Sequence, residues 1–235
     1  AEACKAPTVG PVQDLSFLQQ AYAGNPGFLE KVNNLATKFP TARQIRPDGS
    51  CFFRAYIFTL FERCVKDKSK IPALLAKIEA SQGYCVAAGH DAFTTEEFFE
   101  TFRDTLVDLQ KPDATVATLE GLVADSSTDM YLVTYARCMT SAFLRTNAAL
   151  YEAFLTSHST IDEFCRQEVD PVNREADQLQ IIALTTYLNL PVTVLYLDQS
   201  AGAEATPHRF PEEGGDEAPV TLLYRPGHYD VVYPA

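Results

Sequence analysis

Apolar residues recur every three or four positions between about Asp14 and Leu190, which is the spacing of helices that bury one face. The clearest helical stretches are residues 96–109, 128–144 and 161–169. Hydroxyl side chains that can cap a first turn mark their starts, at Thr94 and Thr95, at Ser126 to Thr128, and at Thr160. The pattern therefore predicts that helices dominate the N-terminal two-thirds.

The pattern changes after Pro191. Residues 192–197 are mostly β-branched or aromatic and predict a buried strand. Residues 220–224 and 228–233 predict two further strands joined by a tight turn at Arg225-Pro226-Gly227. Between them, residues 200–218 are rich in Gly, Pro and Glu, and they predict an exposed loop with one short strand around His208 to Phe210. The sheet is thus expected mainly late in the chain.

The organisation of the 235 residues predicts one α/β domain over 1–235, because no spacer and no repeat of 20 to 50 residues interrupts it. An arm of about residues 1–13 precedes the first predicted helix. The chain is long enough to bury a core of its own. Its 46% hydrophobic and 21% charged residues are typical of a globular protein.

The net charge of −12 would repel a phosphate backbone, so nucleic acid is excluded as an expected partner. The acidic surface serves solubility or the attraction of cationic partners. No run of 18 apolar residues and no signal peptide is visible, so we expect no membrane contact and a cytoplasmic or nuclear location. The six cysteines are scattered without a CxxC pair, which predicts buried free thiols for most of them.

The segment from Arg46 to Tyr56 holds the most informative cysteine. Pro, Asp and Gly form a tight turn, Asp48 or Ser50 can cap a helix, and residues 52–61 are apolar on nearly every face. This predicts a buried helix with only its start accessible. A thiol in the first turn lies among unpaired N–H groups that favour its thiolate form, so Cys51 is either a nucleophile facing a cleft or a small core residue.

An imidazole partner for that thiolate has four candidates. His90, His158 and His208 lie in connections and are predicted to be surface residues. His228 opens the last strand, and Asp230 shares its face because residues two apart on a strand point the same way. The carboxylate is expected to accept the Nδ1 proton and leave Nε2 for the thiol, unless the two form an ordinary edge-strand pair.

Two motifs carry a family resemblance. Residues 48–55 resemble the Asp-Gly-Asn-Cys motif of ovarian-tumour-type deubiquitinases, and residues 224–230 look like the histidine motif of the otubain branch. Residues 129–144, 164–169 and 177–184 look like its intervening segments, so the resemblance covers essentially the whole chain. The departures are Ser50 for Asn, Phe53 for Tyr, and the absence of histidines in 177–180.

The resemblance implies an α/β (α+β) cysteine protease fold, with a small, mostly antiparallel central sheet flanked by helices. It implies a ubiquitin thioesterase that hydrolyses polyubiquitin, of the linkage that signals proteasomal degradation, without a metal or organic cofactor. Cys51 would be the nucleophile, His228 the base and Asp230 the residue that orients it. Asp48 would either supply a main-chain oxyanion donor or brace and cap its turn.

The expected partners are ubiquitin and polyubiquitin chains, and the expected state is a monomer. Two other readings stay open. The chain is a non-catalytic regulator that binds ubiquitin-conjugating enzymes, or it is a cysteine protease for another ubiquitin-like modifier.

Overall fold

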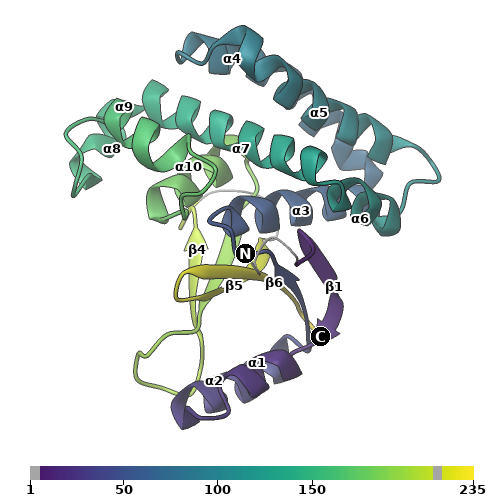
Figure 1. Ribbon diagram of the computed structural model, residues 1–235, viewed down its shortest axis with the longest axis vertical. Helices are drawn as coiled ribbons and strands as arrows, with labels where there is room; N and C mark the ends of the chain where they lie inside the picture. The colour runs from purple at the N-terminus through teal and green to yellow at the C-terminus, as the bar shows by residue number, and fades with distance from the viewer. Residues whose placement is uncertain (1–5, 214–218) are drawn as a thin grey trace.

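A six-stranded sheet lies between two layers of helices in the computed structural model, which describes residues 6–213 and 219–235 (Figure 1). The strands are β1 (Val9–Asp14), β2 (Thr41–Ile45), β3 (Val192–Tyr196), β4 (Thr206–Phe210), β5 (Val220–Arg225) and β6 (His228–Tyr233). Their spatial order is β1-β2-β6-β5-β3-β4, and every neighbouring pair is antiparallel except β3 with β5. The predicted fold class is confirmed.

The helices surround this sheet unequally (Figure 1). They are α1 (Ser16–Ala21), α2 (Pro26–Lys38), α3 (Cys51–Lys66), α4 (Ile71–Ala87), α5 (Ala92–Gln110), α6 (Val116–Ala124), α7 (Ser126–Thr146), α8 (Ala148–Tyr151), α9 (Ile161–Phe164) and α10 (Gln178–Leu188). Short turns of helix follow α3, α8 and α9, at η2 (Lys68–Lys70), η3 (Glu152–Phe154) and η4 (Cys165–Val169). Over the described ranges, no helix combines the length and apolar character needed to cross a membrane.

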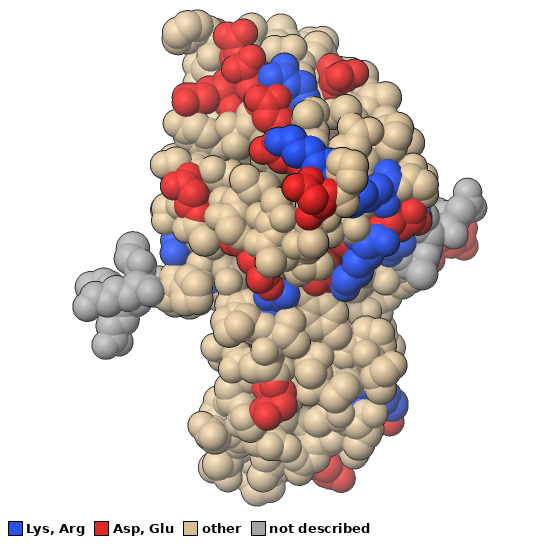
Figure 2. Space-filling view, turned by 90° about the vertical axis from the view of Figure 1, so that its right-hand side faces the viewer, with Lys and Arg blue, Asp and Glu red and all other residues tan. Residues whose placement is uncertain are grey.

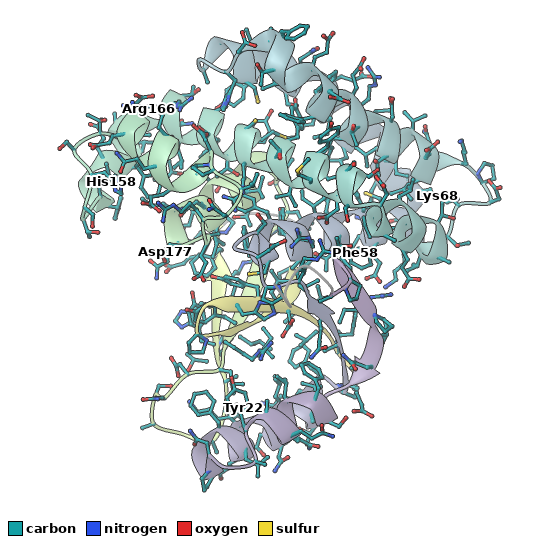
Figure 3. All side chains as sticks on the ribbon, viewed as in Figure 1. Tyr22, Phe58, Lys68, His158, Arg166 and Asp177 are labelled. Carbon is teal, nitrogen blue, oxygen red and sulfur yellow. The ribbon has the colours of Figure 1, made fainter. Side chains whose placement is uncertain are left out.

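The alternation of side chains along the strands creates a core on each face of the sheet. In β3 and β5, Val194 and Leu222 belong to the large core under α3, α7 and α10, whereas Leu195 and Leu223 belong to the smaller core against α1 and α2. Tyr22, in the α1–α2 layer of Figure 3, adds to the smaller core, because its ring stacks on Phe28 with the centroids 4.7 Å apart. Each face of the sheet is therefore covered.

Helix α3 runs through the large core, as its apolar sequence predicts. All but three of its 16 residues are buried. The Tyr56 hydroxyl donates to the Leu190 carbonyl at 2.7 Å, and the Phe61 and Phe102 rings meet edge to face at 5.0 Å. At the start of α3, the Phe52 ring meets the Tyr229 ring edge to face at 5.5 Å, which holds the turn of Cys51 against β6, the strand that carries His228.

The hydrophobic pattern of the sequence did not predict the first two strands. Strand β1 falls largely within the predicted arm, and β2 falls within the region predicted as helical, so that prediction was wrong there. Strand β2 lacks the usual apolar alternation because Arg43 is buried in it, where its guanidinium contacts Glu120 at 2.6 Å and the Gly10 carbonyl at 3.0 Å. Pairing with β6 stabilises β2, and that pairing is remote in sequence.

Helix starts were predicted within a few residues. Helices α5 and α7 begin at Ala92 and Ser126, earlier than predicted, because the preceding aspartates cap them. The carboxylates of Asp91 and Asp125 accept the N–H groups of Thr94 and Thr128, each at 2.8 Å. Thr160 caps α9 as predicted.

Charged residues of both signs mingle on the face that Figure 2 shows, so the net negative charge forms no continuous acidic patch there. Most of them lie over the upper, helical part of the molecule in that view. This distribution fits the role in solubility more directly than a single surface for cationic partners.

Two phenylalanines on α5 provide a test of the large core. Phe102 is fully buried, and its replacement by alanine should lower the free energy of unfolding by about 3 to 5 kcal/mol through lost burial and a cavity. Phe93 is 86% exposed on the same helix, and Phe93→Ala should change it by no more than about 0.5 kcal/mol. Urea unfolding of both variants measures the difference, and equal effects would contradict the described packing.

Candidate active site

The turn before α3 requires a glycine. Gly49 has φ of +82°, and a Cβ at this position would lie 2.5 Å from the Asn173 carbonyl oxygen. Both the left-handed conformation and the close approach exclude a side chain. The tight turn predicted at Pro47, Asp48 and Gly49 thus depends on the glycine, and the segment around Asn173 lies directly against it.

The start of α3 carries no side-chain cap, contrary to the prediction that Asp48 or Ser50 caps it. The Ser50 hydroxyl instead donates to the Val172 carbonyl. The Asp48 carboxylate accepts the Ser50 N–H at 3.0 Å and so braces the turn. Asp48 thus bonds within its own turn and Ser50 bonds to a distant segment, so neither side chain caps the first turn of α3 beside Cys51.

The predicted oxyanion donors are only partly available. The N–H of Asp48 donates to the Arg46 carbonyl at 3.1 Å, and that of Ser50 is taken by the Asp48 side chain. Within the described chain, the N–H groups of Gly49 and Cys51 have no hydrogen-bond partner. They are the two backbone donors of this turn that can face a developing oxyanion.

A buried arginine fixes the Asp48 side chain. Arg54 is 5% exposed and donates to both Asp48 oxygens at 2.8 Å, while its Nε and second terminal nitrogen contact Asp129 at 2.8 and 2.9 Å. Burial alone would raise the pKa of Asp48, but the hydrogen bonds from Arg54 and the Ser50 N–H lower it below the usual value.

Sequence reasoning missed this network. The available signal was Arg54 itself, a charge within the apolar run 52–61, because a buried arginine requires carboxylate or carbonyl partners. Asp129, in the first turn of α7, could not be matched to it because 75 residues separate them.

The second half of the site lies at the start of β6. The turn at Pro226 and Gly227 reverses the chain, with Gly227 at φ of +78°, and places His228 opposite Arg225 in the β5–β6 ladder. The His228 ring contacts Asp230 at 2.8 Å, so the predicted pairing on one strand face is confirmed. Asp230 is fully buried.

The ring nitrogens are used in the opposite way from the prediction. Nε2, not Nδ1, contacts the Asp230 carboxylate, so Nδ1 is the nitrogen left for the thiol. The reason is the fixed position of the carboxylate. Its oxygens also accept the Ile45 N–H at 3.0 Å and the Arg225 guanidinium at 2.7 Å, which holds it where the far end of the ring reaches it.

The charge on His228 is set by its two neighbours. Burial alone would lower its pKa, but the hydrogen bond to Asp230 and the nearby Cys51 sulfur raise it to about 9. Within the described chain, Nδ1 is buried without a hydrogen-bond partner of regular geometry. The ring is therefore protonated at neutral pH and faces the Cys51 sulfur as an imidazolium.

Access to the sulfur is narrower than predicted. Cys51 is 2% exposed, so the expected accessible helix start is wrong for the free protein. The segment around Val172 and Asn173 packs over the turn and covers it. A groove of about 490 Å³ reaches His228 from the side of β1 and β2, and its lining includes Gly10, Gln44, Ile45, Pro47, Arg225 and His228.

The other predicted residues lie elsewhere. His208 is exposed as predicted, but His90 and His158 are half-buried, so the prediction of surface residues is wrong for them. His158 lines a second groove with Asp177 beside α8 to α10 (Figure 3). Cys64, Cys85, Cys138 and Cys165 are buried free thiols as predicted, and Cys4 lies outside the described residues. No group of three potential metal ligands occurs among the described residues.

The sequence and the fold both match known proteins. Ubiquitin thioesterase OTUB1 of Homo sapiens is 38% identical over 232 residues, which cover 98% of this chain and 84% of the human protein. The ovarian tumour domain-containing deubiquitinating enzyme 1 of Arabidopsis thaliana is 34% identical over 253 residues, covering 99% of this chain and 83% of the plant protein.

Among solved structures, a ceOTUB1 ubiquitin aldehyde UBC13~Ub complex contains a chain that is 30% identical, with a TM-score of 0.93. The match covers 100% of this chain and 96% of that chain. The family model described as Peptidase C65 Otubain matches residues 1–234. The resemblance found in the sequence is thereby confirmed, and the chain belongs to the otubain family of peptidases.

Proposed function

We propose that this chain is a cysteine-type deubiquitinase in which Cys51 attacks ubiquitin conjugates. The observation that carries the proposal is that Cys51, at the uncapped start of α3, lies beside a His228 ring that a buried Asp230 holds at 2.8 Å. The otubain relatives named as ubiquitin thioesterases support the choice of substrate.

The reaction follows from the protonation of this pair. The Cys51 thiolate attacks the carbonyl carbon of ubiquitin's terminal glycine, and the C–N bond to a lysine ε-amino group breaks. His228 gives its proton to the departing amine, which leaves a thioester on Cys51. The neutral ring then takes a proton from water, whose oxygen displaces the sulfur and releases ubiquitin. Such proton transfer contributes about 10²- to 10⁴-fold to the rate.

The developing oxyanion is assigned to the N–H groups of Gly49 and Cys51, which have no partner within the described chain. They lie at the positive end of the α3 dipole, which adds to the stabilisation of negative charge. The Asp48 side chain acts indirectly, because its hydrogen bonds to Ser50 and Arg54 set the shape of the turn.

The buried Cys51 sulfur favours a substrate that has no side chains next to the scissile bond. With Cys51 at 2% exposure, the approach has little room for side chains beside the scissile bond, and a diglycine tail has none there. The doubly basic tail of ubiquitin would also be attracted to a chain with net charge −12, mainly through a faster association that salt weakens.

The finer substrate is part of the proposal. Otubain membership favours polyubiquitin of the linkage that signals proteasomal degradation, which requires a second ubiquitin site. We place the activity in the cytoplasm or nucleus, where free thiols such as the five described here are stable. A panel of diubiquitins of every linkage tests this choice. Cleavage of another linkage alone would overturn it, and cleavage of a different modifier's conjugate alone would overturn the ubiquitin assignment.

A second function is favoured by the solved complexes. Their titles record OTUB1 bound to ubiquitin aldehyde together with UBC13~Ub or UBCH5B~Ub. We propose that this chain also binds a ubiquitin-charged conjugating enzyme. Inhibition of ubiquitin transfer that survives Cys51→Ser would support this role, because binding does not need the thiol. Loss of all inhibition in that variant would leave hydrolysis as the sole activity.

The nucleophile can be identified by labelling. We expect an electrophile at the C-terminus of ubiquitin to modify Cys51 alone among the six cysteines. Of the five cysteines that the structure describes, only Cys51 combines a helix start with an imidazolium. Mass spectrometry locates the adduct, and Cys51→Ser should abolish it. An adduct on Cys64, Cys85 or Cys138 with Cys51 unmodified would overturn the assignment.

The proton donor should appear in the pH dependence of kcat/KM. Because the pKa of His228 is raised to about 9, the ring keeps its proton below this pH and loses it above, so activity should fall as pH rises through about 9. Asp230→Asn removes the carboxylate that raises this pKa. It should move the falling limb to lower pH and reduce the rate roughly 10- to 10³-fold.

Two alanine variants control this experiment. His228→Ala should lower turnover more than Asp230→Asn while ubiquitin affinity changes little, whereas the exposed His208→Ala should leave turnover unchanged. Circular dichroism confirms that each variant folds. A falling limb that stays in place in folded Asp230→Asn would show that another residue sets the charge of His228.

A further inference from the structure

A second buried arginine lies behind the catalytic turn. Arg137, on α7, is 1% exposed. One terminal nitrogen donates to the Val169 carbonyl at 2.9 Å, and the other donates to the carbonyls of Gly49 at 2.9 Å and Arg174 at 2.6 Å. The second nitrogen also contacts the Ser50 hydroxyl at 3.1 Å and the Val172 carbonyl at 3.3 Å. Arg137 thereby joins the Cys51 turn to residues 169–174, which cover it.

The charge of Arg137 has no direct counterion. All five acceptors are neutral, and within the described chain no carboxylate contacts the guanidinium. Its carbon lies 4.2 Å from the centroid of the Phe53 ring, and its Nε is buried without a partner within the same residues. Arg54, by contrast, contacts two carboxylates. A buried cation without a counterion is energetically costly. This indicates that Arg137 stabilises a negative charge that forms near it during the reaction.

We propose that Arg137 is a positioning residue that holds the Cys51 turn and supplies a fixed positive charge to the Cys51 thiolate. The proposal rests on the proposed role of Cys51 as nucleophile. The carbonyls of Gly49 and Arg174 fix the guanidinium from two sides, so its charge remains beside the turn without reorganisation when the thiolate forms.

The surrounding charges make this cation significant. Behind the turn, the positive Arg46 and Arg54 act on the negative Asp48 and Asp129, and these four charges cancel. Removing Arg137 therefore takes a positive charge away from the thiolate without leaving a carboxylate unpaired. The other charged groups around the site are His228, Asp230 and Arg225 on the hairpin, Glu175 beside Gly227, and the Asp170–Arg145 pair at the start of the covering segment.

Burial lowers the pKa of Arg137 to about 10, with Asp48 and Cys51 acting against the decrease. Arg137 therefore remains charged at neutral pH, although its charged form is held less firmly than that of an exposed arginine.

Alkylation of Cys51 by iodoacetamide tests the proposal without ubiquitin. The rate of alkylation, followed by mass spectrometry across pH, reports where the thiolate forms. Arg137→Met, which removes the charge, should move the midpoint of this profile up by about one pH unit or more, the effect of losing a nearby cation. Arg137→Lys keeps the charge but loses the two terminal NH₂ groups of the planar guanidinium. Its midpoint should therefore stay close to that of the parent even if its rate falls.

The matched control is Arg145→Met. Arg145 lies two turns further along α7 and holds the same segment through Asp170 at 3.0 Å, away from Cys51. Its loss should loosen the segment without moving the midpoint. Arg137→Gln, which keeps N–H donors, replaces the methionine variant if that one fails to fold. An unmoved midpoint in a folded, uncharged variant, or an equal shift in Arg145→Met, would overturn the proposal.

Two results separate this proposal from the proposed function. If Cys51→Ser retained full ubiquitin hydrolysis, Cys51 would not be the nucleophile, whatever Arg137 did to its alkylation. If Cys51→Ser abolished hydrolysis while Arg137→Met kept the parent midpoint, the assignment of Cys51 as nucleophile would be supported and the proposed role of Arg137 would be contradicted.

Discussion

The burial of α3 on almost every side is the constraint on which the site depends. Its apolar residues pack between the sheet and α7, so the helix cannot turn or slide without opening the large core. Its first residue, Cys51, is therefore fixed in space by contacts made along the whole helix. Because the cap is missing, the first turn keeps N–H groups free for chemistry rather than for helix stability.

The same burial decides the electrostatics. Charges that enter the core beside α3 must be paired or must compensate a charge that the reaction creates. Arg54 is paired, since it forms ion pairs with two carboxylates. Arg137 is suited to compensate a charge that the reaction creates, since backbone carbonyls and an aromatic face hold it without a counterion. The difference between these two arginines depends on partners brought together by the fold, not on their own sequence surroundings.

The parts of the fold that the sequence predicted are those set by local patterns. The buried helix after Cys51, the late strands, the turn at Gly227 and the shared face of His228 and Asp230 all follow from residues close in the chain. Strands β1 and β2 do not, because their stability comes from pairing with each other and with β6. Buried Arg43 even breaks the alternation that would have indicated a strand.

The errors at the site have the same origin. Asp48 and Ser50 had the side chains of helix caps, but two groups that distant residues bring into place compete for them: Arg54, which Asp129 of α7 fixes, and the Val172 carbonyl. Strand periodicity placed Asp230 beside His228 but carried no information on which ring nitrogen it meets. That choice depends on where the carboxylate is held, and the Ile45 N–H holds it from a neighbouring strand.

Asp230 consequently links stability to chemistry. One carboxylate joins β2, β5 and β6 through Ile45, Arg225 and His228, and all three partners donate to it. Burial alone would raise its pKa, but these donors, His228 first, lower it, so the group stays ionised in a fully buried position. The strand register that closes the sheet is thus the register that orients the imidazolium. A shift of β6 by one residue would turn Asp230 to the opposite face and separate it from all three partners at once.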